Sequence, residues 1–142
     1  MIANTSTPNT SLKPLIGVVG GGQLAQMMAQ AAQKRNLEVF VQTSSRDDPA
    51  AHHASRLVLS NSQDQKGTIE LAKYCTSITF ENEWVDVDAL KRIENKDVIF
   101  FPSLDALEPL VDKISQRNLL NKLDIPGPVS YTHLTLPTIC SV

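Results

Sequence analysis

The residues best suited to bind a ligand are a glycine loop, Gly20-Gly21-Gly22, and the Gln23 that follows it. The apolar run 15–19 before the loop predicts a buried strand. After the loop, apolar residues recur at the spacing of one helix face; they are Leu24, Met27, Met28, Ala31 and Ala32. Because glycine has no Cβ, the backbone N–H groups that begin such a helix stay open to a polar or anionic ligand. The stretch 15–32 is therefore predicted to form a ligand cradle.

A second polar group, Glu81-Asn82-Glu83, lies far along the chain, directly after another apolar run. A carboxylate at Glu81 can accept hydrogen bonds from sugar hydroxyls or an amine, and the Gln23 amide both donates and accepts. The alternative interpretation makes both acids solvated loop residues and Gln23 an ordinary first helical residue. The sequence leaves both interpretations open. Trp84 is predicted to lie in the core or to cover part of the crevice.

Elements that would bring these residues together alternate regularly along the chain. Strands are predicted at 15–19, 37–42, 56–59, 77–80 and 98–101, and helices at about 24–32, 64–74, 86–95, 103–110 and 113–123. This alternation is typical of an α/β fold with a doubly wound, five-stranded parallel sheet of order 3-2-1-4-5. Ligands bind such sheets beyond the carboxyl ends of the strands, where the strand order reverses. The glycine loop and Glu81 are thus expected to face one crevice.

Some details of the helices can also be predicted. Asp86, Ser103 and Asp112 are expected to cap helix N-termini. The residues expected to face inward from the second and third helices are Ile69, Leu71, Ala72, Val87, Leu90 and Ile93.

The loop also satisfies the loose dinucleotide fingerprint, as Gly20-x-Gly22-x-x-Ala25. That fingerprint requires an acid at the end of the second strand, where it binds the ribose hydroxyls. Here the strand ends in Gln42-Thr43-Ser44-Ser45, and the first acid is Asp47. The pattern fails at its most diagnostic position, which disfavours NAD binding.

Composition excludes several other classes. The chain has 142 residues, 42% of them hydrophobic, with a net charge of −2, as expected for one globular domain. Because no basic cluster and no long apolar run is present, we expect neither nucleic acid nor a membrane as partner. Residues 1–13 are predicted to be a disordered tail, and Cys75 and Cys140 to be reduced cytoplasmic thiols. His52 and His53 are expected to be solvated loop residues.

Five motifs, taken together, resemble the N-terminal domain of the 5-(carboxyamino)imidazole ribonucleotide synthase family, which are ATP-grasp ligases of purine biosynthesis. The resemblance covers residues 15–128. The motifs are the segment 16–28 with its Gly-Gly-Gly-Gln-Leu sequence, the Asp-Pro-Ala loop at 48–50, Ile-Thr-Phe-Glu-Asn-Glu at 78–83, Phe-Pro-Ser at 101–103, and Asp112-Lys113. Two positions depart from the family pattern: Ala25-Gln26 stands where Gly-Arg is frequent, and the acid that usually ends the second strand is absent.

The resemblance implies a Rossmann-like pre-ATP-grasp domain and a specific reaction. ATP and bicarbonate would give a carboxyphosphate-like intermediate, which the amine of 5-aminoimidazole ribonucleotide captures, with Mg²⁺ on the nucleotide phosphates. Gly22, Gln23, Leu24 and Glu81 would bind the ribonucleotide, and Lys113 would contact ATP. No catalytic residue and no metal ligand are expected in this part of the chain. The family is cytoplasmic and commonly homodimeric.

The resemblance also implies a domain organisation. Residues 14–128 would be the N-terminal domain, with the ATP-grasp and C-terminal domains of the family beyond them. Residues 129–142 do not resemble that continuation, and are expected to be non-native or disordered; 129–134 looks like one reading frame of a sequencing adapter. Such a fragment is expected to be inactive alone. The alternatives are a fragment of a glycinamide ribonucleotide ligase, which usually carries Glu where this chain has Gln23, and a non-catalytic nucleotide-binding domain.

Overall fold

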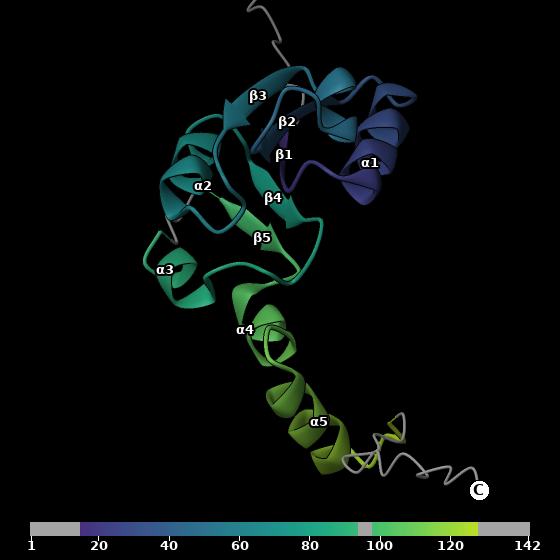
Figure 1. The fold of residues 1–142 in the computed structure, drawn as a ribbon, viewed down its shortest axis with the longest axis vertical. Helices are drawn as coiled ribbons and strands as arrows, with labels where there is room; N and C mark the ends of the chain where they lie inside the picture. Colours follow the sequence, from purple (N-terminus) through teal and green to yellow (C-terminus); the bar gives the residue numbers. More distant parts are fainter. Residues whose placement is uncertain (1–14, 94–97, 128–142) are drawn as a thin grey trace, which may run out of the picture.

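The computed structural model describes residues 15–93 and 98–127 (Figure 1). The strands are β1 (Leu15–Val19), β2 (Glu38–Thr43), β3 (Arg56–Leu59), β4 (Ser77–Phe80) and β5 (Ile99–Phe101). The helices are α1 (Gln23–Gln33), α2 (Gln65–Ala72), α3 (Val87–Lys91), α4 (Leu104–Leu107) and α5 (Lys113–Lys122), with 3-10 turns η1 (Pro49–His52) and η2 (Glu108–Leu110). Each predicted element is present, with its bounds changed by a few residues at most where those bounds are described.

The sheet confirms the predicted α/β topology. Its order is β3-β2-β1-β4-β5, and every neighbouring pair of strands is parallel. Parallel neighbours require crossovers, and these place α1 and η1 against one apolar cluster and α2 and α3 against the other. Figure 1 shows α1 on one side of the sheet and α2 and α3 on the opposite side. The carboxyl ends of β1 and β4 are adjacent as a result.

The buried face of α1 differs from the predicted one. Ala25, Ala29 and Ala32 are the buried residues of this helix, whereas the side chains of Leu24 and Met27 are 55% and 63% exposed. The helix face predicted from the apolar spacing is therefore not the buried one, although Ala32 belongs to both. Alanine side chains let the helix backbone approach the sheet closely, so the contact uses small residues. The larger apolar residues occupy a neighbouring stripe of the helix.

The predicted burial of Ile69 is also wrong, and part of the apolar strand β5 is exposed. Leu71 is fully buried on α2, but Ile69 lies on the outer face of that helix. In β5 only Phe100 enters the core, and Ile99 and Phe101 face the other side of this edge strand. Trp84 is exposed and is not a core residue.

The predicted caps are confirmed. The carboxylate of Asp86 accepts from the Ala89 N–H at 2.9 Å, and the carboxylate of Asp112 accepts from the Ser115 N–H at 2.8 Å. The Ser103 hydroxyl accepts from the Ala106 N–H at 3.3 Å. The single helix predicted after Ser103 is divided into α4 and η2.

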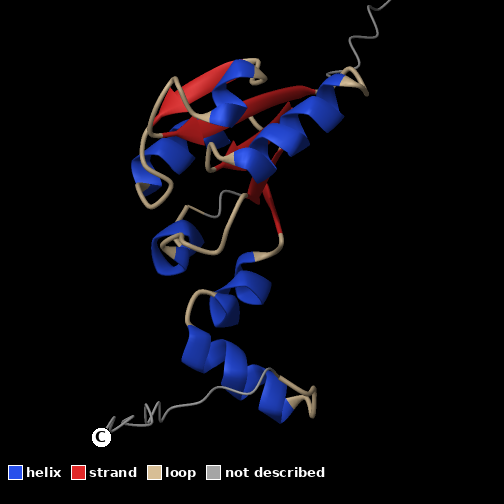
Figure 2. Ribbon diagram, turned by 45° about the vertical axis from the view of Figure 1, so that its right-hand side comes forward, coloured by secondary structure: helices blue, strands red, loops and turns tan. Residues whose placement is uncertain are grey.

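Helix α5 extends away from the sheet, as Figures 1 and 2 show from two sides, and none of its residues is buried. It contacts η2, which directly precedes it in the chain. No helix within 15–93 and 98–127 is long and apolar enough to span a bilayer. Cys75 is buried, and this burial raises the pKa of its thiol to about 11, so it is an unreactive core residue. The end of the predicted helix 86–95, both predicted tails and Cys140 lie outside the described residues.

Candidate functional site

The ends of β1 and β4 meet at the glycine loop. The Glu81 N–H donates to the Val19 carbonyl at 2.9 Å, and the Gly20 N–H donates to the Gln42 carbonyl at 2.9 Å. These bonds continue the sheet pairing one residue beyond the strands. The Glu81 side chain then turns toward the loop, and its Oε2 accepts from the Gly22 N–H at 2.8 Å. Residues 59 positions apart in sequence therefore form one structure.

The glycines make room for this carboxylate. Gly20 has a φ of +114°, and a Cβ at Gly20 would lie 2.6 Å from the Glu81 Cβ. A Cβ at Gly22 would overlap Glu81 Oε1. The cradle was expected to keep its N–H groups open, but the Gly22 N–H is occupied by Glu81. Because Gly20 and Gly22 have no Cβ atoms, the carboxylate of Glu81, the residue after β4, can approach the loop closely.

This contact changes which ligands the cradle suits. Helix α1 has no acidic residue in its first turn and no side-chain cap from its own sequence. Glu81 supplies the negative charge that the positive end of a helix dipole favours. A phosphate at the same place would have to displace that carboxylate, against like-charge repulsion. The arrangement suits a neutral or cationic group, such as a sugar hydroxyl or an amine.

A small polar cavity of about 100 Å³ adjoins Glu81. Among the described residues, its lining includes two carboxylates, Asp48 and Glu81, and no Lys or Arg. The other lining residues are Gly20, Gly21, Gln42, Thr43, Ser44, Ser62 and Asn82. The absence of a cation from this lining again favours hydroxyl or amine groups over phosphate.

Gln42 has a structural role that the sequence did not indicate. Its side chain is fully buried, and its Nε2 donates to the carbonyls of Asn61 at 2.7 Å and Asp64 at 3.0 Å. Its Oε1 accepts from the Thr68 hydroxyl at 2.7 Å. Gln42 therefore fixes the β3–α2 loop, which contributes Ser62 to the cavity. A buried amide occupies the end of β2, where dinucleotide-binding folds place an acid.

The Asp-Pro-Ala loop supports the glycine loop from the other side. The Asp48 carboxylate accepts from the Thr43 hydroxyl and from the Ser45 N–H, which closes the turn after β2. The Ala50 N–H then donates to the Gly21 carbonyl at 2.9 Å. The Asp-Pro-Ala loop therefore supports the glycine loop. The sequence did not indicate this role, because the two loops are far apart along the chain.

His53 does not match its prediction as a solvated residue. It is half-buried, and its Nε2 lies 3.2 Å from Gln26 Nε2 and 3.1 Å from Gln30 Nε2, both on α1. Its carbonyl accepts from the Gln33 side chain at 3.0 Å. His52 is exposed, as expected. Gln26 and Gln30 lie one helical turn apart, which places both amides on the same face of α1.

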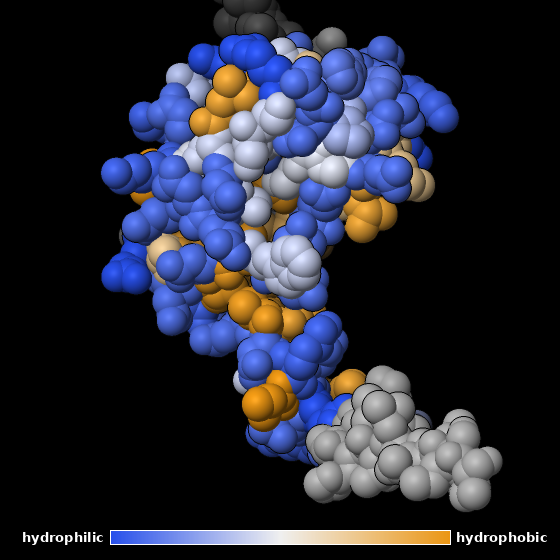
Figure 3. Space-filling model, in the orientation of Figure 1, coloured by the Kyte–Doolittle hydropathy of each residue, from blue (hydrophilic) through white to orange (hydrophobic). Residues whose placement is uncertain are grey.

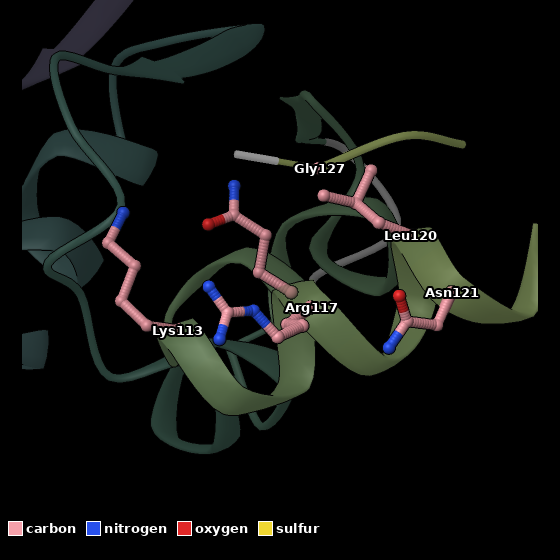
Figure 4. Close-up of a pocket in the computed structure, with 6 residues that line it drawn as sticks. Lys113, Arg117, Leu120, Asn121 and Gly127 are labelled. Atoms are coloured by element: carbon pink, nitrogen blue, oxygen red, sulfur yellow. The ribbon is translucent and has the colours of Figure 1, made fainter. Parts of the chain in front are cut away.

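The remaining predicted site residues lie in two places. Gln23 and Leu24 are exposed in the first turn of α1, beside the Gly22 to Glu81 contact. Lys113, at the start of α5, lies outside the polar cavity. Its Nζ is 3.7 Å from Glu83 Oε1, so the second acid of the β4–α3 loop faces α5. Figure 4 shows Lys113 and Arg117 along a groove of about 420 Å³ on α5.

Comparisons with known proteins agree with this fold. Residues 14–110 match the family model described as "Ribonucleotide synthetase preATP-grasp domain". The N5-carboxyaminoimidazole ribonucleotide synthase of Synechocystis is 47% identical over 122 residues, which is 86% of this chain and 31% of that protein. This chain therefore spans about a third of the length of that relative.

Two solved structures show the same likeness. The N5-carboxyaminoimidazole ribonucleotide synthetase of Thermotoga maritima has a TM-score of 0.72 and 33% identity, over 82% of this chain and 32% of that one. The Aspergillus clavatus enzyme, in complex with ADP and 5-aminoimidazole ribonucleotide, has a TM-score of 0.73 and 31% identity, over 80% of this chain and 30% of that one. With the matched model covering more than half of its residues, this chain belongs to the ribonucleotide synthetase preATP-grasp domain family.

Proposed function

We propose that this chain is the N-terminal, ribonucleotide-binding part of an N5-carboxyaminoimidazole ribonucleotide synthase, and that 5-aminoimidazole ribonucleotide binds at Gly22, Gln23, Leu24 and Glu81. The observation that carries the proposal is the Glu81 carboxylate, held on the Gly22 N–H at the switch point of the sheet. The Aspergillus clavatus relative binds this ribonucleotide together with ADP. That relative supports the choice of substrate.

The residues have distinct roles in this proposal. Glu81 accepts hydrogen bonds from the ribose hydroxyls or the amine, while its bond to Gly22 fixes its orientation. Gln23 donates and accepts through its amide, and Leu24 offers an exposed apolar contact. Since no Lys or Arg of ranges 15–93 and 98–127 lines the polar cavity, the substrate phosphate is proposed to point away from the cradle.

The reaction proposed for the whole ligase has two steps. The γ-phosphoryl group of ATP passes to bicarbonate, which gives ADP and carboxyphosphate. The amine nitrogen of the ribonucleotide then attacks the carboxyl carbon, so that phosphate leaves and a carbamate forms. Lys113 is proposed to contact ATP at the edge of the nucleotide site.

Mg²⁺ is proposed to accompany ATP in the whole ligase, with its ligands elsewhere. No group of three His, Cys, Asp or Glu side chains that could bind a metal ion occurs among the residues the structure describes. By similarity to the family, we assign no metal ligand and no catalytic residue to this part of the ligase, and expect the chain alone to be inactive. A cytoplasmic location and a homodimeric whole enzyme complete the proposal, by similarity to the family.

Calorimetric titration of the chain tests the proposed substrate. We expect 5-aminoimidazole ribonucleotide to bind, glycinamide ribonucleotide to bind more weakly, and NAD not to bind. Gln23→Ala removes a neutral hydrogen bond and is expected to weaken binding of 5-aminoimidazole ribonucleotide roughly 3- to 10-fold. Gln65→Ala is the matched control, because Gln65 is likewise the exposed first residue of a helix.

Other outcomes would point to the alternatives. Tighter binding of glycinamide ribonucleotide would support the sister ligase, and binding of NAD alone would support a nucleotide-binding domain without this reaction. Equal effects of Gln23→Ala and Gln65→Ala would contradict the position of the site.

A further inference from the structure

Trp84 is the only tryptophan of the chain and lies three residues after Glu81, in the loop between β4 and α3. Its side chain is 67% exposed. Tryptophan contributes a large contact area when it is covered, so an exposed tryptophan three residues from Glu81 is a candidate contact for a ligand.

The structure holds this residue in its exposed position. The Trp84 N–H donates to the Asn82 side-chain oxygen at 3.0 Å, and the Val85 N–H donates to the Glu83 carbonyl at 2.9 Å. Val85 is buried in the main apolar cluster. The backbone on both sides of Trp84 is therefore fixed, and the exposure of the ring does not come from a loose loop.

Two further apolar side chains are exposed at the start of α1. Leu24 and Met27 lie on the first two turns of α1, and the bond from the Gly22 N–H to Glu81 ties that helix to the tryptophan loop. Figure 1 shows the loop after β4 and the start of α1 at the same end of the sheet. Figure 3 shows that the molecular surface is hollowed between this end and α4.

The size of the polar cavity indicates where the base of a ribonucleotide must lie. Sites for small-molecule ligands typically measure roughly 300–1,000 Å³. The cavity beside Glu81 measures about 100 Å³ and so holds only one part of such a ligand. A hydroxyl or amine group matches the polar lining of this cavity. The planar ring of the base would bind more favourably to an apolar surface outside the cavity.

We propose that Trp84 stacks on the heteroaromatic base of the ribonucleotide and is a specificity-determining residue. This inference rests on the proposed function and extends it. An indole face binds a planar heterocycle through stacking and excludes water from one side of the ring. In this arrangement Glu81 binds the polar edge of the ligand, and Trp84 favours ligands that carry a base over ligands that do not.

Two ligands and two variants test this role. Trp84→Ala is expected to weaken binding of 5-aminoimidazole ribonucleotide roughly 5- to 10-fold in calorimetry, and to leave binding of ribose 5-phosphate, which has no base, unchanged. Trp84→Phe keeps an aromatic face and should retain most of the affinity. In the unmodified chain, the ribonucleotide should quench tryptophan fluorescence and ribose 5-phosphate should not.

The outcomes separate this inference from the proposed function. If Gln23→Ala weakens binding of the ribonucleotide but Trp84→Ala does not, the function stands and the stacking role is wrong. Equal weakening of both ligands by Trp84→Ala, or quenching by ribose 5-phosphate alone, would also overturn stacking. If the unmodified chain binds neither ligand, both proposals fail. Thermal unfolding of each variant shows whether it folds, and the fluorescence test requires no variant.

Discussion

Replacing Gly20 with alanine is expected to lower the free energy of unfolding by about 3 kcal/mol, and to abolish ribonucleotide binding. Gly20 has a φ of +114°, a conformation that L-residues avoid, and its new Cβ would lie 2.5 Å from Glu81 Oε2. Relief requires either the backbone or Glu81 to move. Urea denaturation and calorimetric titration of the variant measure the two effects.

Gly127 provides the matched control. A Cβ at Gly127 would lie 3.7 Å from Leu120 Cδ1, which is an ordinary contact. Gly127→Ala is therefore expected to change stability by less than about 0.5 kcal/mol. Similar losses in the two variants would show that Gly20 is not constrained by Glu81.

Replacing Gln42 with leucine should destabilise the fold by a similar amount, about 3 kcal/mol. Leucine has a similar volume, so the main loss is of the three hydrogen bonds that Gln42 makes to the β3–α2 segment. The Asn61 and Asp64 carbonyls and the Thr68 hydroxyl would lose their partner. Urea denaturation with an unchanged m-value would locate the effect in the folded state.

A double-mutant cycle tests the mechanism of that loss. Thr68→Val removes the hydroxyl that Gln42→Leu would leave unpaired in the core. The double variant should therefore be more stable than the sum of the two single changes predicts. Strict additivity would contradict a direct bond between the two side chains. Gln63→Leu, on the exposed loop, is the control for the introduction of a leucine.

The order of the strands and the caps of the helices could be predicted from local patterns. Apolar runs typical of strands alternate with segments whose apolar residues have the spacing of a helix. Asp86, Ser103 and Asp112 directly precede helices. The meeting of Gly20 and Glu81 followed from topology alone, because β1 and β4 flank the switch point. These features depend on residues near one another or on general rules of chain connection.

The features that could not be predicted from the sequence depend on contacts between side chains that are far apart along the chain. The occupation of the Gly22 N–H by Glu81 requires atomic contact between residues in different elements. The role of Gln42 appears only when the β3–α2 loop folds over it. On α1, the buried face consists of alanines, because a helix that packs closely on the sheet needs small side chains there. A pattern of hydrophobicity does not measure side-chain size. Glu81 and Glu83 have different surroundings although both follow β4.

This pair of acids allows the most direct test of the site. We would titrate 5-aminoimidazole ribonucleotide into the chain and into Glu81→Gln and Glu83→Gln, which remove one charge each from the same loop without changing its shape. Because hydrogen bonds to a charged group contribute about 1.5–3 kcal/mol, Glu81→Gln should weaken binding at least roughly 10-fold. Glu83→Gln should leave the affinity within about 2-fold, because its carboxylate faces Lys113. Equal affinities for the two variants would contradict a ribonucleotide site built on Glu81.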